Sequence, residues 1–398
     1  MALDWGARYS STLVGALEMR GKPDYQSQIY YPIDIESWIA GDHPLRAVKR
    51  RADEVLSSMR KDFERAYANV GRPSIPPEML LKALLLQALY SVRSERQLVD
   101  QIQMNLLYKW FIDLSLDAPA WNATTFTKNR ERFEKHGLLR KFFERVVAQA
   151  YVEDWASDDH FTVDGTLIES YASLKSLRPK DSGVERVSEG SDDDDAGNPT
   201  VNFRGEKRKN ETHRSVVDPE ARLYRKSYGV AAKLCHGAHV LMENRHGLVV
   251  DVSVSEANGR SERTEALKLV RRARRRHGLR MKTLAADKGY AAGAFLHELE
   301  VEEGVVPLVA MPDVAIKSEG VEADARRRAK RRRRTKRYAV AQRIRKRVEE
   351  INGWTKVIGG MRRSRHVGRW KIYQMALVVH TAYNLLRLGK LEALAQAA

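Results

Sequence analysis

One stretch of sequence decides the fold: HFTVDGTLI, residues 160–168. Polar and apolar residues alternate along it, which places Phe161 and Val163 on one face and Asp164 on the other, as in a half-exposed β-strand. Gly165 follows, so the carboxylate projects from a rigid element beside a permissive backbone. Burying a carboxylate in an apolar strand is costly unless it is paired or binds a metal. Taken alone, such an aspartate is more often a cap, turn or ion-pair residue than a catalytic one.

The sequence after this strand predicts an α/β domain with a mixed sheet flanked by helices. Its expected elements are strands at 240–242 and 248–254 joined by a hairpin turn, a helix from Ser261 to near Gly278, and strands at 283–286 and 305–310. Asp287 directly follows the strand at 283–286, which is the carboxyl end where open α/β sheets place their sites. A second acidic candidate therefore ends a second strand.

The N-terminal part, residues 1–150, predicts an all-helical domain. Its signals are an apolar run at 79–92, a possible capping box formed by Ser94 and Gln97 that opens a helix through Leu106, and a third helix start at 122–127. This third helix carries Lys128, Arg130 and Arg132. The pattern is compatible with a helix-turn-helix-like unit whose last helix enters the major groove of DNA, although helix pairs of this kind are more often plain structure.

The catalytic part is expected at residues 156–390, with a flexible insertion at about 178–210 and a closing helix at 372–388. The insertion is rich in Ser, Gly, Asp and Lys and includes the run Asp192–Asp195. Consecutive carboxylates on a loop usually repel one another and stay solvated, so this run is not a metal-site candidate.

The composition indicates a soluble, cytoplasmic protein that binds a polyanion. Lys and Arg number 70 against 52 acidic residues, for a formal charge of +18, and the basic residues concentrate at 271–276 and 326–337. Nucleic acid is the expected partner. No apolar stretch reaches the roughly 20 residues of a membrane span. The single cysteine, Cys235, excludes an internal disulfide and a cysteine-built zinc site.

A helix is expected at 336–356. Four polar residues lie on one face of it because they are spaced by 3, 4 and 7: Gln342, Arg345, Glu349 and Lys356. One interpretation is an exposed helix with an Arg345–Glu349 ion pair; the other gives Glu349 to a metal and the cations to phosphates. Glu350 competes with Glu349, because adjacent helix residues point about 100° apart. Gly353 indicates either close packing or an early helix end.

At this point three segments carry a family resemblance: TVDGT at 162–166, ADKGY at 286–290 and RVEEINGWTK at 347–356. They resemble the DDE transposases of bacterial insertion sequences, specifically the insertion-sequence-five group. Arg345, Glu349 and Lys356 fit the signature Tyr-x2-Arg-x3-Glu-x6-Lys, but Gln342 stands where tyrosine is usual and Asn352 replaces an expected aromatic residue. Further similar segments lie at 71–93, 124–133, 212–226 and 237–244.

The resemblance implies an RNase H-like core in which Asp164, Asp287 and Glu349 bind two Mg²⁺ or Mn²⁺ ions. Such a pair activates the attacking oxygen and stabilises the leaving one, so hydrolysis and then strand transfer need no nucleophilic side chain. The implied partners are double-stranded DNA, as terminal inverted repeats and target, and a second copy of the chain on the nucleoid. Arg225 and Lys226 join the other basic candidates for DNA contact. A nuclease without strand transfer, or an inactive remnant that acts as a repressor, remains an alternative.

Overall fold

The computed structural model describes residues 34–67, 74–180, 202–203, 206–225 and 231–397. The described part before residue 153 contains helices joined by turns and loops and has no strand, as predicted. Its helices are α1 (Ile35–Trp38), α2 (Pro44–Ser58), α3 (Arg60–Ala66), α4 (Pro77–Leu89), α5 (Glu95–Met104), α6 (Leu106–Ile112), α7 (Thr124–Lys135) and α8 (Leu138–Val152). Proline opens α4 at its first turn, where a missing N–H costs nothing. Most of this helix is buried, which explains why it is apolar nearly all round.

The predicted capping box at the start of α5 is half formed. Ser94 Oγ accepts the N–H of Gln97, but the Gln97 side chain accepts the N–H of Arg93 instead of that of Ser94. The helix also ends at Met104, earlier than expected, because Asn105 is extended and caps α6 by accepting the N–H of Leu107. The prediction of one helix through Leu106 was therefore wrong: an asparagine with a competing side-chain hydrogen bond divides it into two.

A mixed sheet follows the helices. Its strands, in the spatial order β10–β9–β1–β7 with β6 and β8 both pairing with β7, are β1 (His160–Glu169), β6 (Arg222–Tyr224), β7 (Lys233–Glu243), β8 (Val249–Glu256), β9 (Thr283–Ala286) and β10 (Val306–Val309). β7 is antiparallel to β1 and β8, whereas β1, β9 and β10 are parallel. The expected mixed sheet is confirmed.

The central strand β1 is more deeply buried than its alternating sequence suggested. Phe161, Thr162 and Val163 are all fully buried. Thr162 is polar but lies inside because its hydroxyl donates to the side chain of Asn244, 2.7 Å away. A satisfied hydroxyl costs little to bury, so polar alternation here did not indicate a solvent-facing side.

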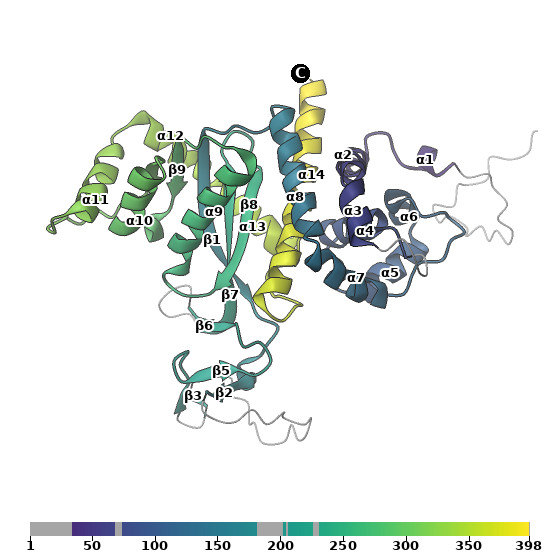
Figure 1. Ribbon diagram of the computed structural model, residues 1–398, viewed down its shortest axis with the longest axis horizontal. Helices are drawn as coiled ribbons and strands as arrows, with labels where there is room; N and C mark the ends of the chain where they lie inside the picture. Colours follow the sequence, from purple (N-terminus) through teal and green to yellow (C-terminus); the bar gives the residue numbers. More distant parts are fainter. Residues whose placement is uncertain (1–33, 68–73, 181–201, 204–205, 226–230, 398) are drawn as a thin grey trace, which may run out of the picture.

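Helices cover both faces of the sheet and connect it to the N-terminal helices. They are α9 (Ser261–His277), α10 (Gly293–His297), α11 (Val321–Arg332), α12 (Lys336–Arg345), α13 (Arg347–Val357) and α14 (Arg369–Gln396). α14 packs against β8 and also against α2, α4 and α8. Figure 1 shows α8 and α14 side by side between the sheet and the other N-terminal helices. One continuous hydrophobic core runs through both parts.

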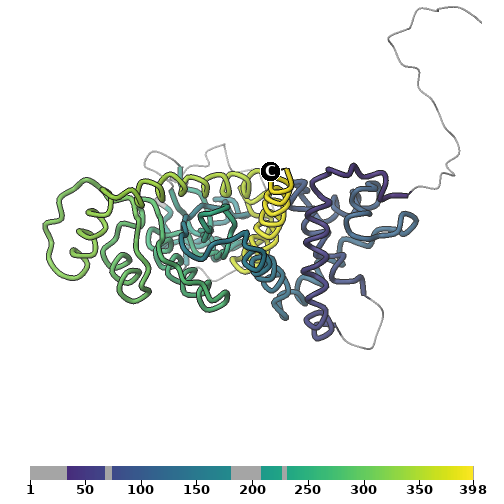
Figure 2. The backbone as a smooth tube through the Cα atoms, turned by 90° about the horizontal axis from the view of Figure 1, so that it is seen from above, coloured from purple at the N-terminus to yellow at the C-terminus, as the bar shows by residue number. Residues whose placement is uncertain are grey.

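The helix expected at 336–356 is divided in two. α12 ends at Arg345 and α13 starts at Arg347, yet Lys346 keeps helical torsion angles. Figure 2 shows the two helices as a nearly continuous rod that runs toward α14. Gly353 neither packs closely nor ends the helix, because a Cβ there would meet nothing within 4 Å and α13 continues to Val357. The closing helix α14 is longer than expected at both ends.

Short strands surround the predicted insertion. They are β2 (Leu177–Pro179), β3 (Asn202–Phe203), β4 (Glu206–Lys207) and β5 (His213–Ser215), and they pair as β2 with β5 and β3 with β4. A short 3-10 turn, Leu174–Ser176, precedes them. Residues 181–201, which include the run Asp192–Asp195, lie outside the described residues.

Candidate active site

The site begins where the pairing between β1 and β9 stops. The parallel ladder pairs Thr162 with Ala285 and goes no further. Asp164, within β1, and Asp287, directly after the end of β9, each lie two residues beyond this last pair and therefore at about the same level. Residues at equal register in parallel strands point to the same face, and adjacent strands are about 4.8 Å apart. The fold therefore presents two carboxylates side by side at the mouth of the gap that opens between the strands.

The two carboxylates affect each other electrostatically. Burial, together with the negative charge of Asp287, raises the pKa of Asp164 to about 6. Arg345 and the backbone N–H of Gly165 act in the opposite direction but do not cancel the effect. Asp287 is held in place by the N–H of Gly289, which donates to its Oδ1 at 2.8 Å. A pair of acids that repel each other in a half-buried site is a common arrangement at catalytic centres.

The α12–α13 rod approaches these acids with polar side chains. Asn352 Nδ2 donates to Asp164 Oδ2 at 2.8 Å. Gln342 donates to the carbonyl of Leu308 at 2.5 Å and to that of Ala286 at 3.4 Å, and its own oxygen accepts from Arg345 Nε at 3.1 Å. The two positions that depart from the family pattern thus have defined contacts: residue 352 holds the first aspartate, and residue 342 ties the rod to the ends of β9 and β10.

Glu349 does not contact the two aspartates directly. It is exposed in the first turn of α13, three residues before Asn352 and therefore on the same helical face. Glu350 points elsewhere, because its charge acts on Tyr383 of α14. Lys356 lies one turn after Asn352 on this face. Among the described residues, no three carboxylate, imidazole or thiolate side chains come close enough together to hold a metal ion.

Two residues at the site were not predicted from the sequence. Glu262, in the first turn of α9, places its carboxylate against Gly165 and Gly289, where a Cβ on either glycine would lie 3.1 Å and 3.3 Å from a Glu262 oxygen. Tyr290 is buried, and its hydroxyl has no hydrogen-bond partner among the described residues. In the sequence, Glu262 looks like an ordinary acid in the first turn of a helix, where it interacts favourably with the helix dipole. Tyr290 looks like an ordinary aromatic residue of the core. Only the fold brings Glu262 to the site, whereas Tyr290 lies in the segment ADKGY, close to Asp287 in the sequence.

The residues present fit a divalent metal ion with a preference for oxygen ligands. The donors at the gap are carboxylates and an amide, which suit Mg²⁺ or Mn²⁺. Burial and the charge of Asp287 raise the pKa of Asp164, and neither Arg345 nor the N–H of Gly165 offsets them fully. A cation between the two would remove that repulsion. The buried, unpartnered hydroxyl of Tyr290 is a further polar group whose partner could be supplied with the ion and its water.

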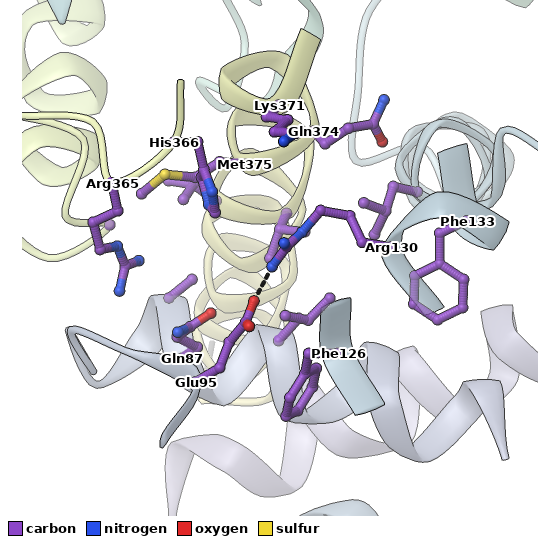
Figure 3. Close-up of a pocket in the computed structure, with 16 residues that line it drawn as sticks. Gln87, Glu95, Phe126, Arg130, Phe133, Arg365, His366, Lys371, Gln374 and Met375 are labelled. Atoms are coloured by element: carbon purple, nitrogen blue, oxygen red, sulfur yellow. Dashed lines mark hydrogen bonds and ion pairs between the residues drawn. The ribbon is translucent and has the colours of Figure 1, made fainter. Parts of the chain in front are cut away.

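The predicted DNA contacts on α7 are largely engaged within the protein. Arg130 pairs with Glu95 in a cavity of about 50 Å³ beneath α14 (Figure 3). The Arg132 guanidinium lies 4.2 Å from the ring centre of Tyr67 and donates to Asn129. Lys128 is exposed. Of this helix's three candidates, only Lys128 is presented to solvent without such a contact.

Among the remaining basic candidates, some are exposed and others are paired with acids within the protein. Arg225 is exposed, whereas Lys226 lies outside the described residues. The basic run at 271–276 is mostly paired with acids: Arg271 with Glu298 and Glu303, Arg272 with Asp251, Arg274 with Glu303 and Arg276 with Glu144. This run does not form the free basic surface that its charge suggested. In the second run the exposed residues are Arg331, Arg334, Lys336 and Arg337.

The histidines and the cysteine of the sheet have structural contacts. His236 Nε2 bonds to Asp218 and His239 Nε2 to Ser255, each at 2.8 Å. Burial lowers the pKa of His239 to about 4, which keeps it neutral. Cys235 is a buried free thiol, as expected. None of the helices in the described parts of the chain has the length and apolar character needed to cross a membrane.

Comparison with known proteins gives the class of the chain. A family described as "Transposase domain (DUF772)" matches residues 33–132, and one described as "Transposase DDE domain" matches residues 196–385. No curated protein matches. A solved structure titled "Mos1 transposase paired-end complex with left transposon end" aligns at 12% identity over 84% of this chain and 85% of that chain, with a TM-score of 0.20, which is too low to carry an argument. Both matched families are described as transposase families, and the second spans Asp287 and Glu349: these matches support a DDE transposase.

Proposed function

We propose that this transposase belongs to the insertion-sequence-five group, that it cleaves DNA at the terminal inverted repeats of its element, and that it joins the freed 3′-hydroxyls to target DNA. The observation that carries the proposal is the level placement of Asp164 and Asp287 where the β1–β9 ladder ends. One acid within a strand and one directly after a strand, beside an amide that orients the first, form a preorganised site for a hard cation.

In this proposal Asp164, Asp287 and Glu349 hold two Mg²⁺ or Mn²⁺ ions. Bound there, the ions would activate the attacking oxygen and stabilise the leaving oxygen of the phosphodiester. Asn352 keeps the Asp164 carboxylate oriented through its 2.8 Å hydrogen bond. Arg345 and Lys356 lie on the same side of the rod and are assigned to phosphate oxygens, where a charge-assisted hydrogen bond is about twice as strong as a neutral one.

Glu349 is favoured over Glu350 as the third acid. It shares a helical face with Asn352, which contacts Asp164, whereas the charge of Glu350 acts on Tyr383. Glu349 still has to approach the aspartates, since three acids do not converge in the described residues. Its exposed side chain and its place next to the α12–α13 junction leave room for that movement.

The proposed partners are double-stranded DNA and a second copy of the chain, acting on the nucleoid in the cytoplasm. Residues 1–150 would form the DNA-binding part and residues 156–390 the catalytic part. Lys128, Arg225 and the exposed arginines near 331–337 are the basic side chains best placed to reach DNA, because the described structure does not engage them in the contacts that hold Arg130 and Arg132.

The test uses a labelled DNA fragment that carries the sequence flanking the gene, incubated with Mg²⁺ and purified protein. Wild type is expected to cut at the element ends and join them to a second DNA. Asp164→Asn is expected to lose cleavage by at least about 10³-fold while its affinity for the ends changes little, because a metal ligand acts mainly in the reaction. Asp154→Asn is the matched control: Asp154 is exposed, and its charge is paired with Arg245.

The outcomes separate the alternatives. Cutting without joining would identify a nuclease, and binding without cutting by either protein would identify an inactive repressor. Full cleavage by Asp164→Asn would remove the aspartate from the mechanism and overturn the assignment of the site.

A further inference from the structure

We infer that Glu262 is a further metal-ligating residue of this active site, placed between Asp164 and Asp287 by the two glycines that follow them. The inference rests on the proposed function and adds to it a carboxylate from α9, which none of the catalytic motifs contains. It concerns the same cation that Asp164 and Asp287 would hold.

Gly165 and Gly289 have no side chains, and this leaves room for the Glu262 carboxylate beside them. A Cβ on Gly165 would lie 3.1 Å from Cγ and from Oε1 of Glu262, which is tighter than ordinary contact. A Cβ on Gly289 would lie 3.3 Å from Glu262 Oε2 and 3.1 Å from Asp287 Oδ1. The carboxylates of Glu262 and Asp287 therefore border the same small space. Glycine at both positions leaves that space open, and either alanine would intrude on it.

The cation that acts on the Glu262 carboxylate is Arg263, but its guanidinium donates to the carbonyls of Gly289 and Gly259 and forms no ion pair with Glu262. The Glu262 carboxylate forms no hydrogen bond or ion pair with any described residue, although it is more than half buried. Burial and the charge of Asp287 raise its pKa. Most other partly buried acids in the described residues do form ion pairs, as Glu300 does with Arg328 and Arg332. A carboxylate that is buried, unpaired and next to two more acids is costly unless a cation joins it.

Tyr290 provides an independent sign of a missing group. Its ring is 1% exposed and its hydroxyl is buried without a partner. The acids that act on this hydroxyl electrostatically are Glu262, Asp164 and Asp287, so it faces the same three carboxylates. A buried hydroxyl normally finds a hydrogen bond. A metal-bound water, or a carboxylate drawn inward by the ion, would supply one.

The three acids do not yet enclose an ion, since no three such side chains converge in the described residues. Glu262 can close the distance by side-chain rotation alone, because it sits in the first turn of a helix whose backbone is fixed by the packing of Ala266, Leu269 and Val270. Attraction to a divalent cation would drive that rotation. We therefore expect the cation to be bound with Glu262 even without DNA.

The experiment measures Mn²⁺ binding to the full chain without DNA, by the loss of the electron paramagnetic resonance signal of free Mn²⁺. It compares wild type with Glu262→Gln, Asp164→Asn and Glu265→Gln. Glu265 is the control because it lies one turn further along α9 and pairs with Lys268. Glu262→Gln and Asp164→Asn are each expected to weaken Mn²⁺ binding at least about tenfold, and Glu265→Gln less than twofold.

A second measurement shows that the variant is folded. Without metal, Glu262→Gln should melt at or above the wild-type temperature because it removes a repelling charge, but Mg²⁺ should raise its melting temperature less than that of wild type. If Glu262→Gln binds Mn²⁺ like wild type while Asp164→Asn does not, Glu262 is no ligand and the proposed function stands. If Asp164→Asn also binds like wild type, or if wild type binds no Mn²⁺, the inference and the metal site both fail.

Discussion

At the scale of a single residue, the fold places the charge of Asp164 in an unfavourable environment. The strand β1 holds Asp164 rigidly, and burial together with the neighbouring charge of Asp287 raises its pKa to about 6, well above the ordinary value of 3.8. The folded chain without metal therefore binds a proton at this carboxyl more tightly than the unfolded chain does. Its penalty for burying the charge is absent below pH 4, grows between pH 4 and pH 6, and is complete above pH 6. Above pH 4 the charged Asp164 therefore lowers the stability of the metal-free fold.

Replacing Asp164 by asparagine should remove this penalty. In EDTA, Asp164→Asn is expected to melt at nearly the wild-type temperature at pH 4 and above it at pH 7. At ~1.4 kcal/mol for each pH unit between the two pKa values, the gain is at most ~3 kcal/mol. The asparagine oxygen can still accept from Asn352, so the contact itself is kept. Calorimetry across pH tests this, and a difference that does not vary with pH would contradict it.

What could be predicted at this scale depended on local pattern. Asp164 and Asp287 were identified because each is an acid in or after an apolar strand, and the ladder between β1 and β9 brings them level. Glu262 could not be identified, because its proximity depends on the packing of α9 across the sheet. Arg130 and Arg132 looked available for DNA because charge alone does not reveal Glu95 or Tyr67 opposite them.

At the scale of elements, the α12–α13 rod and its junction with α14 position the helical face that carries Glu349 and Asn352. The periodicity of residues 336–356 predicted one helix, and the observed interruption at Lys346 could not be foreseen because no proline or glycine marks it. Gly353 did suggest a break, yet the helix passes through it with open space beside it. Gly359, just after α13, is the glycine that close packing requires: a Cβ there would overlap Val379 of α14 and lie 2.7 Å from the carbonyl of Thr355.

These two glycines should respond oppositely to alanine. Gly353→Ala is expected to stabilise the protein by ~0.5–1 kcal/mol, because it restricts the unfolded chain and meets nothing in the folded one. Gly359→Ala is expected to destabilise it by ~1–3 kcal/mol, because α13 and α14 must separate. Urea unfolding of both variants measures the free energy of unfolding. Equal effects of the two substitutions would show that the α13–α14 contact is loose.

At the scale of the whole molecule, the two predicted domains share their interior. The core is continuous from α2 to β8, and α14 packs on both parts. A buried ion-pair group reinforces the junction: Asp251 of β8 is fully buried, accepts from Arg272 Nε of α9 at 2.5 Å, and lies 2.7 Å from Arg140 Nη1 of α8, although the latter pair lacks hydrogen-bond alignment. The predicted boundary between residues 150 and 156 marks a change of secondary structure. It does not mark a gap in the packing.

Asp251→Asn should therefore destabilise both parts together. Removing the Asp251 charge leaves Arg272 without its carboxylate and Arg140 with Glu144 alone, which costs ~3–5 kcal/mol. Hydrogen exchange followed by mass spectrometry should show α4 and β8 losing protection to the same extent, because a shared core unfolds as one unit. Asp154→Asn, which breaks only an exposed pair, should change protection by less than ~1 kcal/mol. If β8 loses protection while α4 keeps its own, the helical part folds independently and the boundary near residue 150 divides two true domains.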